Sequence, residues 1–234
     1  MFNLQHDVIR SKERYYAFDE IESIRAKLLL TTKEIEVEDF GAGSTYTKSN
    51  TRTIQSIAKQ ASKKPKHAQL LFRIAYHFQP KTILELGTSL GLTTAYLGKA
   101  CPNAKIITLE GSDSIAKVAT VNHNKLNIHN IKLLVGEFSQ HLDSAIEDLQ
   151  TIDFAYVDGN HKKEPTLAYF EKLLPHKSEN SIFVFDDIYW SKEMTAAWKE
   201  IKKHKAVRQT IDLYEFGLVF FKNDQEREHF TVYH

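Results

Sequence analysis

Short apolar segments alternate with amphipathic segments along the whole chain after Pro80. The first five gaps between the apolar segments each fit one helix, at residues 91–100, 112–126, 138–149, 161–174 and 190–204. Strands that are apolar throughout and separated by helices are typical of a parallel sheet covered on both faces. The sequence therefore predicts an α/β fold. Its seven expected strands are residues 82–86, 105–110, 131–136, 152–158, 181–187, 206–214 and 216–222.

The last two apolar segments are separated by a turn at residues 215–217. A parallel crossover needs about a dozen residues or more, so this pair must form an antiparallel hairpin. We expect a seven-stranded, mostly parallel sheet with an antiparallel last strand and helices on both faces. Such a doubly wound, Rossmann-like sheet binds its ligands at the carboxyl ends of its strands.

The chain before Pro80 follows a different pattern. Residues 18–30 have a helical period, and residues 53–78 predict one or two helices interrupted at Pro65. Residues 35–45 (IEVEDFGAGST) suggest a strand fragment followed by a glycine turn, which we expect to approach the site. We therefore divide the chain into a helical N-terminal extension or lid, residues 1–79, and a catalytic domain, residues 80–234.

Composition limits the classes of protein. The 234 residues have a net charge of +1, which argues against a uniformly basic nucleic-acid-coating protein. No apolar segment approaches the roughly 20 residues of a membrane span, and the N-terminus lacks the apolar core of a signal peptide. A single cysteine, Cys101, cannot form an intramolecular disulfide, which favours a reducing compartment. We expect a soluble, cytoplasmic protein.

A glycine-rich turn follows the first expected strand of the sheet. Its pattern, E-x-G-x-S-x-G, includes Glu85, Gly87, Thr88, Ser89 and Gly91. The glycines permit a tight turn and a close ligand, and the following helix start offers free N–H groups. An acid two residues before the first glycine suits a cationic ligand better than a pyrophosphate. S-adenosylmethionine carries both an ammonium and a sulfonium.

Acids also end the next two expected strands. Glu110, followed by Gly111, is placed to bind ribose hydroxyls. Glu137 could accept from an adenine amino group, and Phe138 could cover the ring. Each signal is weak by itself, because a strand-end acid is often only solvated or favours a helix N-terminus. Their succession at one edge of the sheet indicates a cofactor site.

Three further carboxylates follow the fourth and fifth strands. Asp158 ends the fourth strand, and Asp186 and Asp187 end the fifth. Neighbouring strand ends lie about 5 Å apart, so these groups would repel one another unless they share a cation or a proton. An all-oxygen set suits Mg²⁺ or another divalent cation. The alternative is an Asp that caps the following helix beside a solvated acid.

In this order, ILELGTSLG, ITLEGS, LLVGEF, FAYVDGNH and FVFDD resemble a class I S-adenosylmethionine-dependent methyltransferase over residues 80–222. The chain is most similar to the small O-methyltransferases of the catechol O-methyltransferase type and to the cephalosporin-hydroxylase-like group. Ser89 departs from the glycine that many members have there. The resemblance implies methyl transfer to a hydroxyl, with S-adenosyl-L-methionine as cofactor.

The resemblance also implies roles for the acidic residues. Related enzymes hold a divalent metal with acids at the positions of Asp158, Asp186 and Asp187. They have a proton-accepting Lys three residues after the first of these, where this chain has His161. We therefore expect His161 to be the general base, with Asp158 and Asp187 also catalytic. The alternative is that His161 only supports the site from behind or faces solvent. Tyr189 and Trp190 would be either a wall for a substrate ring or packing residues.

Several different functions are compatible with these residues. Residues 87–91 match G-x-S-x-G, the nucleophile elbow of α/β-hydrolases, although the helical segment before it and the missing oxyanion loop argue against that class. The same strand and loop pattern also fits an RNA or protein methyltransferase, or a non-catalytic cofactor-binding module. Five other histidines have no metal-ligand spacing and are expected at the surface: His123, His129, His141, His176 and His204.

Charge is distributed unevenly along the chain. Residues 41–80 contain seven basic residues and no acidic one. This segment is either a solvated helix face or a docking surface for an anionic acceptor, in which Lys63, Lys64 and Lys66 would take part. The expected partner is therefore a small molecule, and it is anionic if the segment is a docking surface. Nucleic acid is less favoured, and a homodimer is left open.

Overall fold

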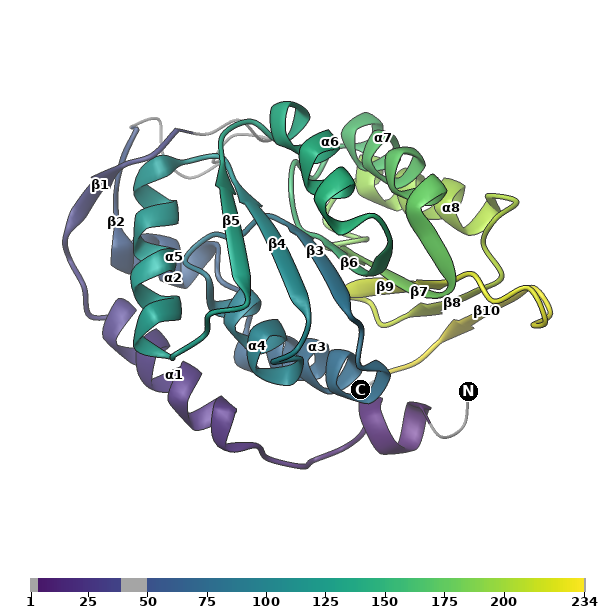
Figure 1. Cartoon of the computed structure of the whole chain (residues 1–234), viewed down its shortest axis with the longest axis horizontal. Coiled ribbons are helices and arrows are strands. Elements are labelled where there is room, and N and C mark those ends of the chain that lie inside the picture. The colour runs from purple at the N-terminus through teal and green to yellow at the C-terminus, as the bar shows by residue number, and fades with distance from the viewer. Residues whose placement is uncertain (1–3, 39–49, 234) are drawn as a thin grey trace.

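The computed structural model describes residues 4–38 and 50–233 of the chain. Its centre is one twisted sheet of eight strands in the order β10-β8-β9-β7-β6-β3-β4-β5 (Figure 1). The strand bounds are β3 Thr82–Leu86, β4 Lys105–Glu110, β5 Ile131–Val135, β6 Ile152–Val157, β7 Lys177–Asp186, β8 Gln209–Asp212, β9 Phe216–Phe220 and β10 Glu228–Thr231.

The strand directions confirm the expected topology. Strands β3 to β7 pair in parallel, and β9 pairs antiparallel with both β7 and β8. All seven expected strands are present. Strand β10 is an addition that the sequence pattern did not predict, and it pairs in parallel with β8 at the sheet edge.

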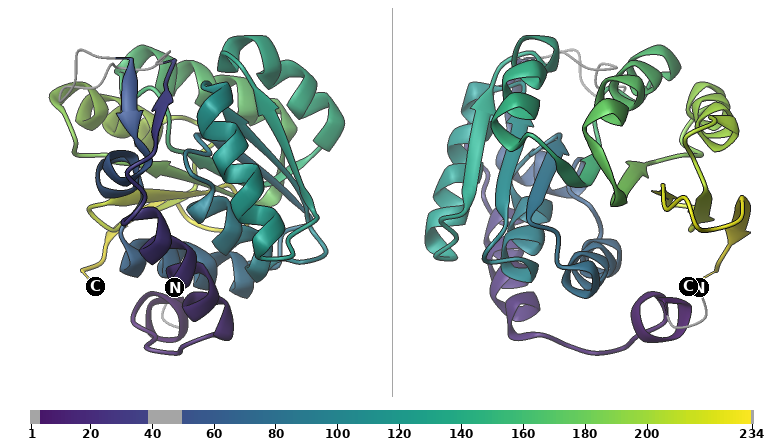
Figure 2. Two further views of the ribbon diagram at one scale, coloured as in Figure 1. Left: turned by 90° about the vertical axis from the view of Figure 1, so that its left-hand side faces the viewer. Right: turned by 45° about the vertical axis from the view of Figure 1, so that its right-hand side comes forward.

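Helices cover both faces of the sheet, as Figure 2 shows. Buried side chains of α6, α7 and α8 form one core with alternate residues of the strands. The other core contains residues from α1 to α5 and from the opposite strand faces. The bounds are α1 Tyr16–Leu28, α2 Ile54–Gln60, α3 Pro65–Phe78, α4 Leu92–Ala100, α5 Asp113–Lys125, α6 Phe138–Leu149, α7 Lys163–Leu173 and α8 Lys192–Lys203.

The N-terminal part of the chain lies against the same core. Phe18 of α1, Phe72 of α3 and Tyr96 of α4 are buried with their rings in contact. The expected helical segment at residues 53–78 is two helices, and Pro65 begins the second, where its missing N–H and fixed φ are tolerated. The glycine turn expected at residues 39–44 lies outside the described residues.

Short elements complete the architecture. A π-helix, η1 (Leu4–Ile9), packs against α3, and β1 (Glu34–Glu36) pairs antiparallel with β2 (Thr51–Thr53). A 3₁₀ turn, η2 (Leu174–His176), leads into β7. Within the described part of the chain, every helix is too short or too polar to cross a membrane.

Candidate active site

The carboxyl ends of β3, β4, β6 and β7 meet at one edge of the sheet. Parallel pairing in register places the ends of β3 and β4 side by side, at Leu86 and Leu109. On the other side of β3, Leu86 pairs with Val157 of β6, which in turn pairs with Phe185 of β7. The last residues of these strands and the loops after them include most of the residues that the sequence singled out. This edge is the place where such sheets bind ligands.

The glycine loop follows β3 and leads into α4. Gly87 and Gly91 have φ values of 105° and 78°, which favour glycine. A Cβ at Gly87 would lie 2.3 Å from the backbone oxygen of Asp158, so a side chain has no space there. The N–H groups of Gly87 and Thr88 both donate to the Leu109 carbonyl, at 3.0 and 3.1 Å. The loop is therefore held tightly against the neighbouring strand ends.

Glu85 lies in the middle of this arrangement and is fully buried. Its Oε2 accepts hydrogen bonds from the hydroxyls of Thr94 (2.5 Å) and Thr108 (2.6 Å). Its Oε1 has no hydrogen-bond partner among the described residues. Burial raises the pKa of Glu85 to about 7, against the two hydroxyl donors that lower it. A buried carboxylate oxygen without a donor fits a cationic or hydrogen-bonding ligand group.

Glu110 ends β4 and faces the glycine loop. Its carboxylate accepts from the backbone N–H groups of Ser89, at 2.8 Å, and Ser112, at 3.0 Å. Thr88 is buried, and its hydroxyl lies 2.5 Å from that of Thr108. Gly111 lies within the turn that the Glu110 carboxylate closes. These contacts place the loop residues and the acid of β4 within reach of one bound molecule.

Two residues of α5 also hold the glycine loop, and sequence reasoning missed them. Asn122 donates to the Leu90 carbonyl at 2.9 Å, and the His123 ring donates to the Gly91 carbonyl at 3.0 Å. The expectation that His123 is a surface residue is wrong: it is 5% exposed, and burial lowers its pKa to about 4. The available signal was the helical period, because Asn122 and His123 share the buried face with Ile115 and Ala119.

Glu137 and Phe138 begin α6, after a turn at Gly136. Glu137 is exposed, and Phe138 is half-buried. The Phe138 ring lies against Gly159, where an added Cβ would come within 2.5 Å of it. The ring therefore covers the backbone just after Asp158, on the same edge of the sheet as the glycine loop.

Asp158 connects the glycine loop with the acidic cluster. Its N–H donates to the Leu86 carbonyl at 2.9 Å, and its carboxylate accepts from the buried Tyr156 hydroxyl at 3.1 Å. Burial raises the pKa of Asp158 to about 6, although the Lys63 ammonium opposes this shift. Asp158 thus lies next to both parts of the site.

Asp186 and Asp187 lie at the end of β7. The Asp186 side chain is fully buried, and that of Asp187 is 25% exposed. The Lys63 ammonium forms an ion pair with Asp186 and lies 3.6 Å from Asp187 Oδ1. Burial raises the pKa of Asp186 well above its usual value. Burial lowers the pKa of Lys63, but attraction by Asp158, Asp186 and Asp187 outweighs this and raises it. The sequence pattern did not predict a lysine inside the cluster.

His161 completes the cluster. Its Nε2 lies 3.6 Å from Asp158 Oδ1, and its ring lies 6.4 Å from that of Trp190. Asp158, His161 and Asp187 each offer a ligand atom, and these atoms lie within 4.8 Å of one another. Two carboxylates and an imidazole are suitable ligands for a divalent cation such as Mn²⁺. The donor set therefore fits a metal ion, with Asp186 beside it and paired with Lys63.

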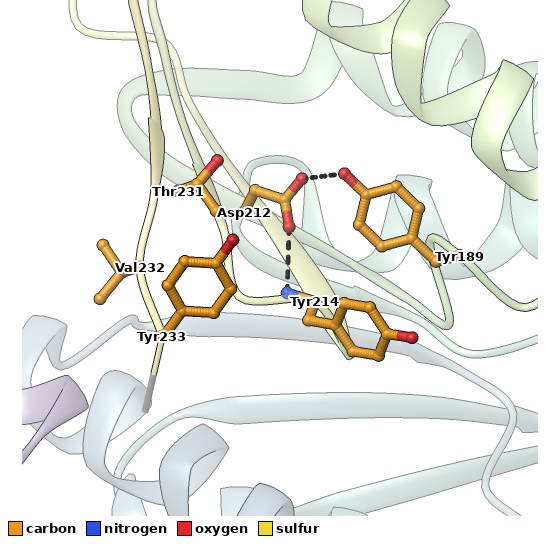
Figure 3. Close-up of a pocket in the computed structure, with 6 residues that line it drawn as sticks. All are labelled: Tyr189, Asp212, Tyr214, Thr231, Val232 and Tyr233. Atoms are coloured by element: carbon orange, nitrogen blue, oxygen red, sulfur yellow. Dashed lines mark hydrogen bonds between the residues drawn. The ribbon is translucent and has the colours of Figure 1, made fainter.

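A small hollow of about 170 Å³ lies near the same edge, at the ends of β8 and β10 (Figure 3). Its floor is Asp212, whose carboxylate accepts from the Tyr189 hydroxyl and from the Tyr214 N–H at 3.0 Å. The rings of Tyr189 and Tyr214 are in contact, with centroids 5.6 Å apart. Thr231, Val232 and Tyr233 close the other side.

Comparison with known proteins agrees with this architecture. Residues 84–188 match the model of the family Methyltransf_24, described as a methyltransferase domain. The chain is 28% identical, over 127 residues, to the catechol O-methyltransferase of Niastella koreensis; the match covers 53% of this chain and 57% of that protein. The protein y4gI of Sinorhizobium fredii is 24% identical over 167 residues, 65% of this chain and 18% of that protein. The chain thus spans less than two thirds of these relatives.

Solved structures share the fold over nearly the whole chain. The O-methyltransferase of Bacillus cereus in complex with SAH has a TM-score of 0.64 at 17% identity, covering 93% of this chain and 96% of that one. TomG of Streptomyces achromogenes, an O-methyltransferase of tomaymycin synthesis in complex with SAM, has a TM-score of 0.64 at 15% identity, covering 95% of each chain. Residues 84–188 are thus similar to a methyltransferase domain, and the chain shares its fold with solved O-methyltransferases.

Proposed function

We propose that the protein transfers a methyl group from S-adenosylmethionine to a hydroxyl of a small-molecule acceptor. The observation that carries this proposal is the direct contact between the glycine loop and the acidic cluster. A Cβ at Gly87 would meet the Asp158 backbone at 2.3 Å, so a cofactor on the loop and an acceptor at the acids would be neighbours. The comparisons support the reaction class, since the Niastella koreensis relative and the Bacillus cereus structure are O-methyltransferases by name.

The proposed cofactor contacts follow from the chemistry of each group. Glu85 Oε1, which has no hydrogen-bond partner in the described part of the chain, would attract the cationic amino group of the methionine part. Glu110 would bind the ribose hydroxyls, and Glu137 and Phe138 would hold the adenine. The backbone of Gly87, Thr88, Ser89, Gly91 and Gly111 would line the path between them. S-adenosylmethionine supplies the activated methyl group, so the protein's task is to hold the sulfonium in line with the acceptor.

The acceptor oxygen would be prepared at the acidic cluster. Asp158 and Asp187 would hold a divalent cation, which would lower the pKa of the acceptor hydroxyl and fix its orientation. His161 would accept the hydroxyl proton at Nε2. The new O–C bond would form as the C–S bond breaks, and the sulfur would leave as a neutral thioether in S-adenosylhomocysteine. Asp186 would contribute to the charge of the cluster rather than to the reaction.

The acceptor would extend toward the hollow at the ends of β8 and β10. Tyr189 follows the acidic pair by two residues, and Tyr214 and Tyr233 line the same space. Exposed aromatic rings at this edge suit the apolar part of a small acceptor. Lys64 and Lys66 are exposed beside the largely buried Lys63, and they would favour an anionic group on the acceptor.

Calorimetric titration with S-adenosylmethionine and S-adenosylhomocysteine tests the cofactor assignment. We expect binding, which Glu110→Gln should weaken about tenfold because a charged hydrogen-bond acceptor is lost. Glu147→Gln, an exposed acid on α6, is the matched control and should bind like the wild type. Absence of binding at millimolar ligand would show that the cofactor assignment is wrong.

Transfer of a labelled methyl group to a panel of small hydroxyl compounds tests the reaction class. Activity should depend on an added divalent cation and fall strongly in His161→Gln. If His161 is the base, this variant keeps the metal affinity of the wild type. A loss of metal affinity in this variant would instead show that His161 is a metal ligand. Methyl transfer to RNA or protein only would favour the other class of acceptor.

A further inference from the structure

The acidic cluster contains a positive charge of its own. Lys63 reaches it from the segment between α2 and α3, and its side chain is only 11% exposed. The ammonium pairs with the fully buried Asp186 and lies 3.6 Å from Asp187 Oδ1. The lysine therefore occupies part of the space in which carboxylates of this kind hold a divalent cation.

The position of Lys63 is specific. Of the three neighbouring lysines, Lys64 before α3 and Lys66 in its first turn are exposed, while Lys63 alone turns inward. Pro65 begins α3 directly afterwards, and the buried face of that helix anchors the segment to the core. The fold therefore holds the Lys63 backbone beside the edge of the sheet.

Asp187 is shared between two groups of residues. With Asp158 and His161 it forms the set of ligand atoms that lie within 4.8 Å of one another. It is also the second carboxylate that Lys63 approaches. A divalent cation on this set would stand close to the ammonium, and two cations at such separations repel strongly where water is excluded. A bound metal ion and the Lys63 ammonium would therefore compete for the Asp187 carboxylate.

We propose that Lys63 is the resident cation of the acidic cluster and that it competes with a divalent metal for Asp187. The lysine holds the three carboxylates together without metal and keeps the metal affinity of the wild-type protein low. This inference rests on the metal site of the proposed function. It makes Lys63 a positioning residue that sets the charge of the site, and it assigns a function to one residue of the basic segment.

Titration of Mn²⁺ into the full-length protein tests the competition, with calorimetry and the electron paramagnetic resonance signal of free Mn²⁺ as readouts. Lys63→Met keeps the length of the side chain and removes its charge, and we expect it to bind Mn²⁺ at least about tenfold more tightly than the wild type. Lys63→Arg keeps the charge and should bind Mn²⁺ as weakly as the wild type does. Lys59→Met, exposed on α2, removes the same charge elsewhere and should stay within about twofold of the wild type.

Equal or weaker Mn²⁺ binding by Lys63→Met would overturn the proposal, because a purely structural lysine gives that result. So would a gain of the same size in Lys59→Met, or no binding by any variant. Circular dichroism establishes that each variant is folded. If Lys63→Met does not fold, the pair Lys63→Met with Asp186→Asn leaves no unpaired buried carboxylate, and the same gain is expected through Asp158 and Asp187.

The outcome is separable from that of the proposed function. Binding of S-adenosylhomocysteine in metal-free buffer reports on the cofactor site alone. If the protein binds this ligand and Lys63→Met binds Mn²⁺ no more tightly than the wild type, the cofactor assignment stands and the inference about Lys63 is wrong. A protein that does not bind the ligand loses the assignment, while the comparison of Mn²⁺ affinities still decides the role of Lys63.

Discussion

Glu85 has the most unusual environment of any acid in the proposed cofactor site. It is fully buried, its pKa is raised to about 7 by burial, and one carboxylate oxygen has no partner among the described residues. Below this pKa the group is neutral, and above it the carboxylate is charged. Only the charged form attracts the amino group of S-adenosylmethionine.

We therefore expect the affinity for S-adenosylmethionine to rise about tenfold from about pH 6 to about pH 8 and then to level off. Glu85→Gln should bind more weakly and lose this rise, whereas the exposed Glu147→Gln should keep it. Calorimetry at several pH values measures the effect. A rise that persists in Glu85→Gln would assign it to another group.

Sequence reasoning placed Glu85, Glu110, Asp158, Asp186 and Asp187 at one edge because parallel strands end together. That rule needs only the strand positions, which the apolar segments define clearly. It carries no information on segments that reach the edge from elsewhere. Lys63 does so from before α3, and the pairing of its ammonium with Asp186 depends on a path that no residue pattern encodes.

At the scale of the elements, the strands and helices that follow Pro80 lie where the periodicity predicts them, within a few residues. The short strands were missed for a physical reason. β2 and β10 have three and four residues, and only a minority of the side chains in β10 are even partly buried. Such strands form because a neighbouring edge offers hydrogen bonds, so their own sequence shows little alternation.

Strand β10 supports a prediction about stability. Removing residues 224–234 would leave the edge of β8 unpaired and would remove Val232, which is buried in the core. We expect the melting temperature to fall by about 5 °C, since about 1–2 kcal/mol corresponds to about 2–8 °C in a protein of this size.

Val232→Ser, at full length, should show part of the same decrease. Differential scanning fluorimetry measures both variants. An unchanged melting temperature in the two would mean that β10 contributes nothing to the cooperative structure.

At the scale of the whole molecule, the N-terminal helices and the sheet share one core. Leu71 and Phe72 of α3 belong to the same buried cluster as Ala95 and Tyr96 of α4. The sequence suggested an extension at residues 1–79, because the hydrophobic pattern changes at Pro80. A change of pattern marks a change of architecture, and it does not show whether the two parts unfold separately.

We expect a single cooperative unfolding transition in urea. Far-UV circular dichroism, which reports on all helices, should coincide with the fluorescence of Trp190 and Trp198, which lie in or beside α8. An early loss of helical signal without a change in fluorescence would contradict this expectation. It would show that the first helices form a separately melting lid.

The order of strands in the sheet has a consequence for the chain as it leaves the ribosome. Strand β3 is central: its partner on one side is β4, which follows directly, and on the other side β6, which begins at Ile152. Until β6 is synthesised, one edge of β3 presents unpaired backbone groups beside apolar side chains, a combination that promotes association between chains. While only β3, β4 and β5 have been made, the strand that is central in the finished sheet is therefore an exposed edge. Lower temperature during that stage would favour correct folding over association.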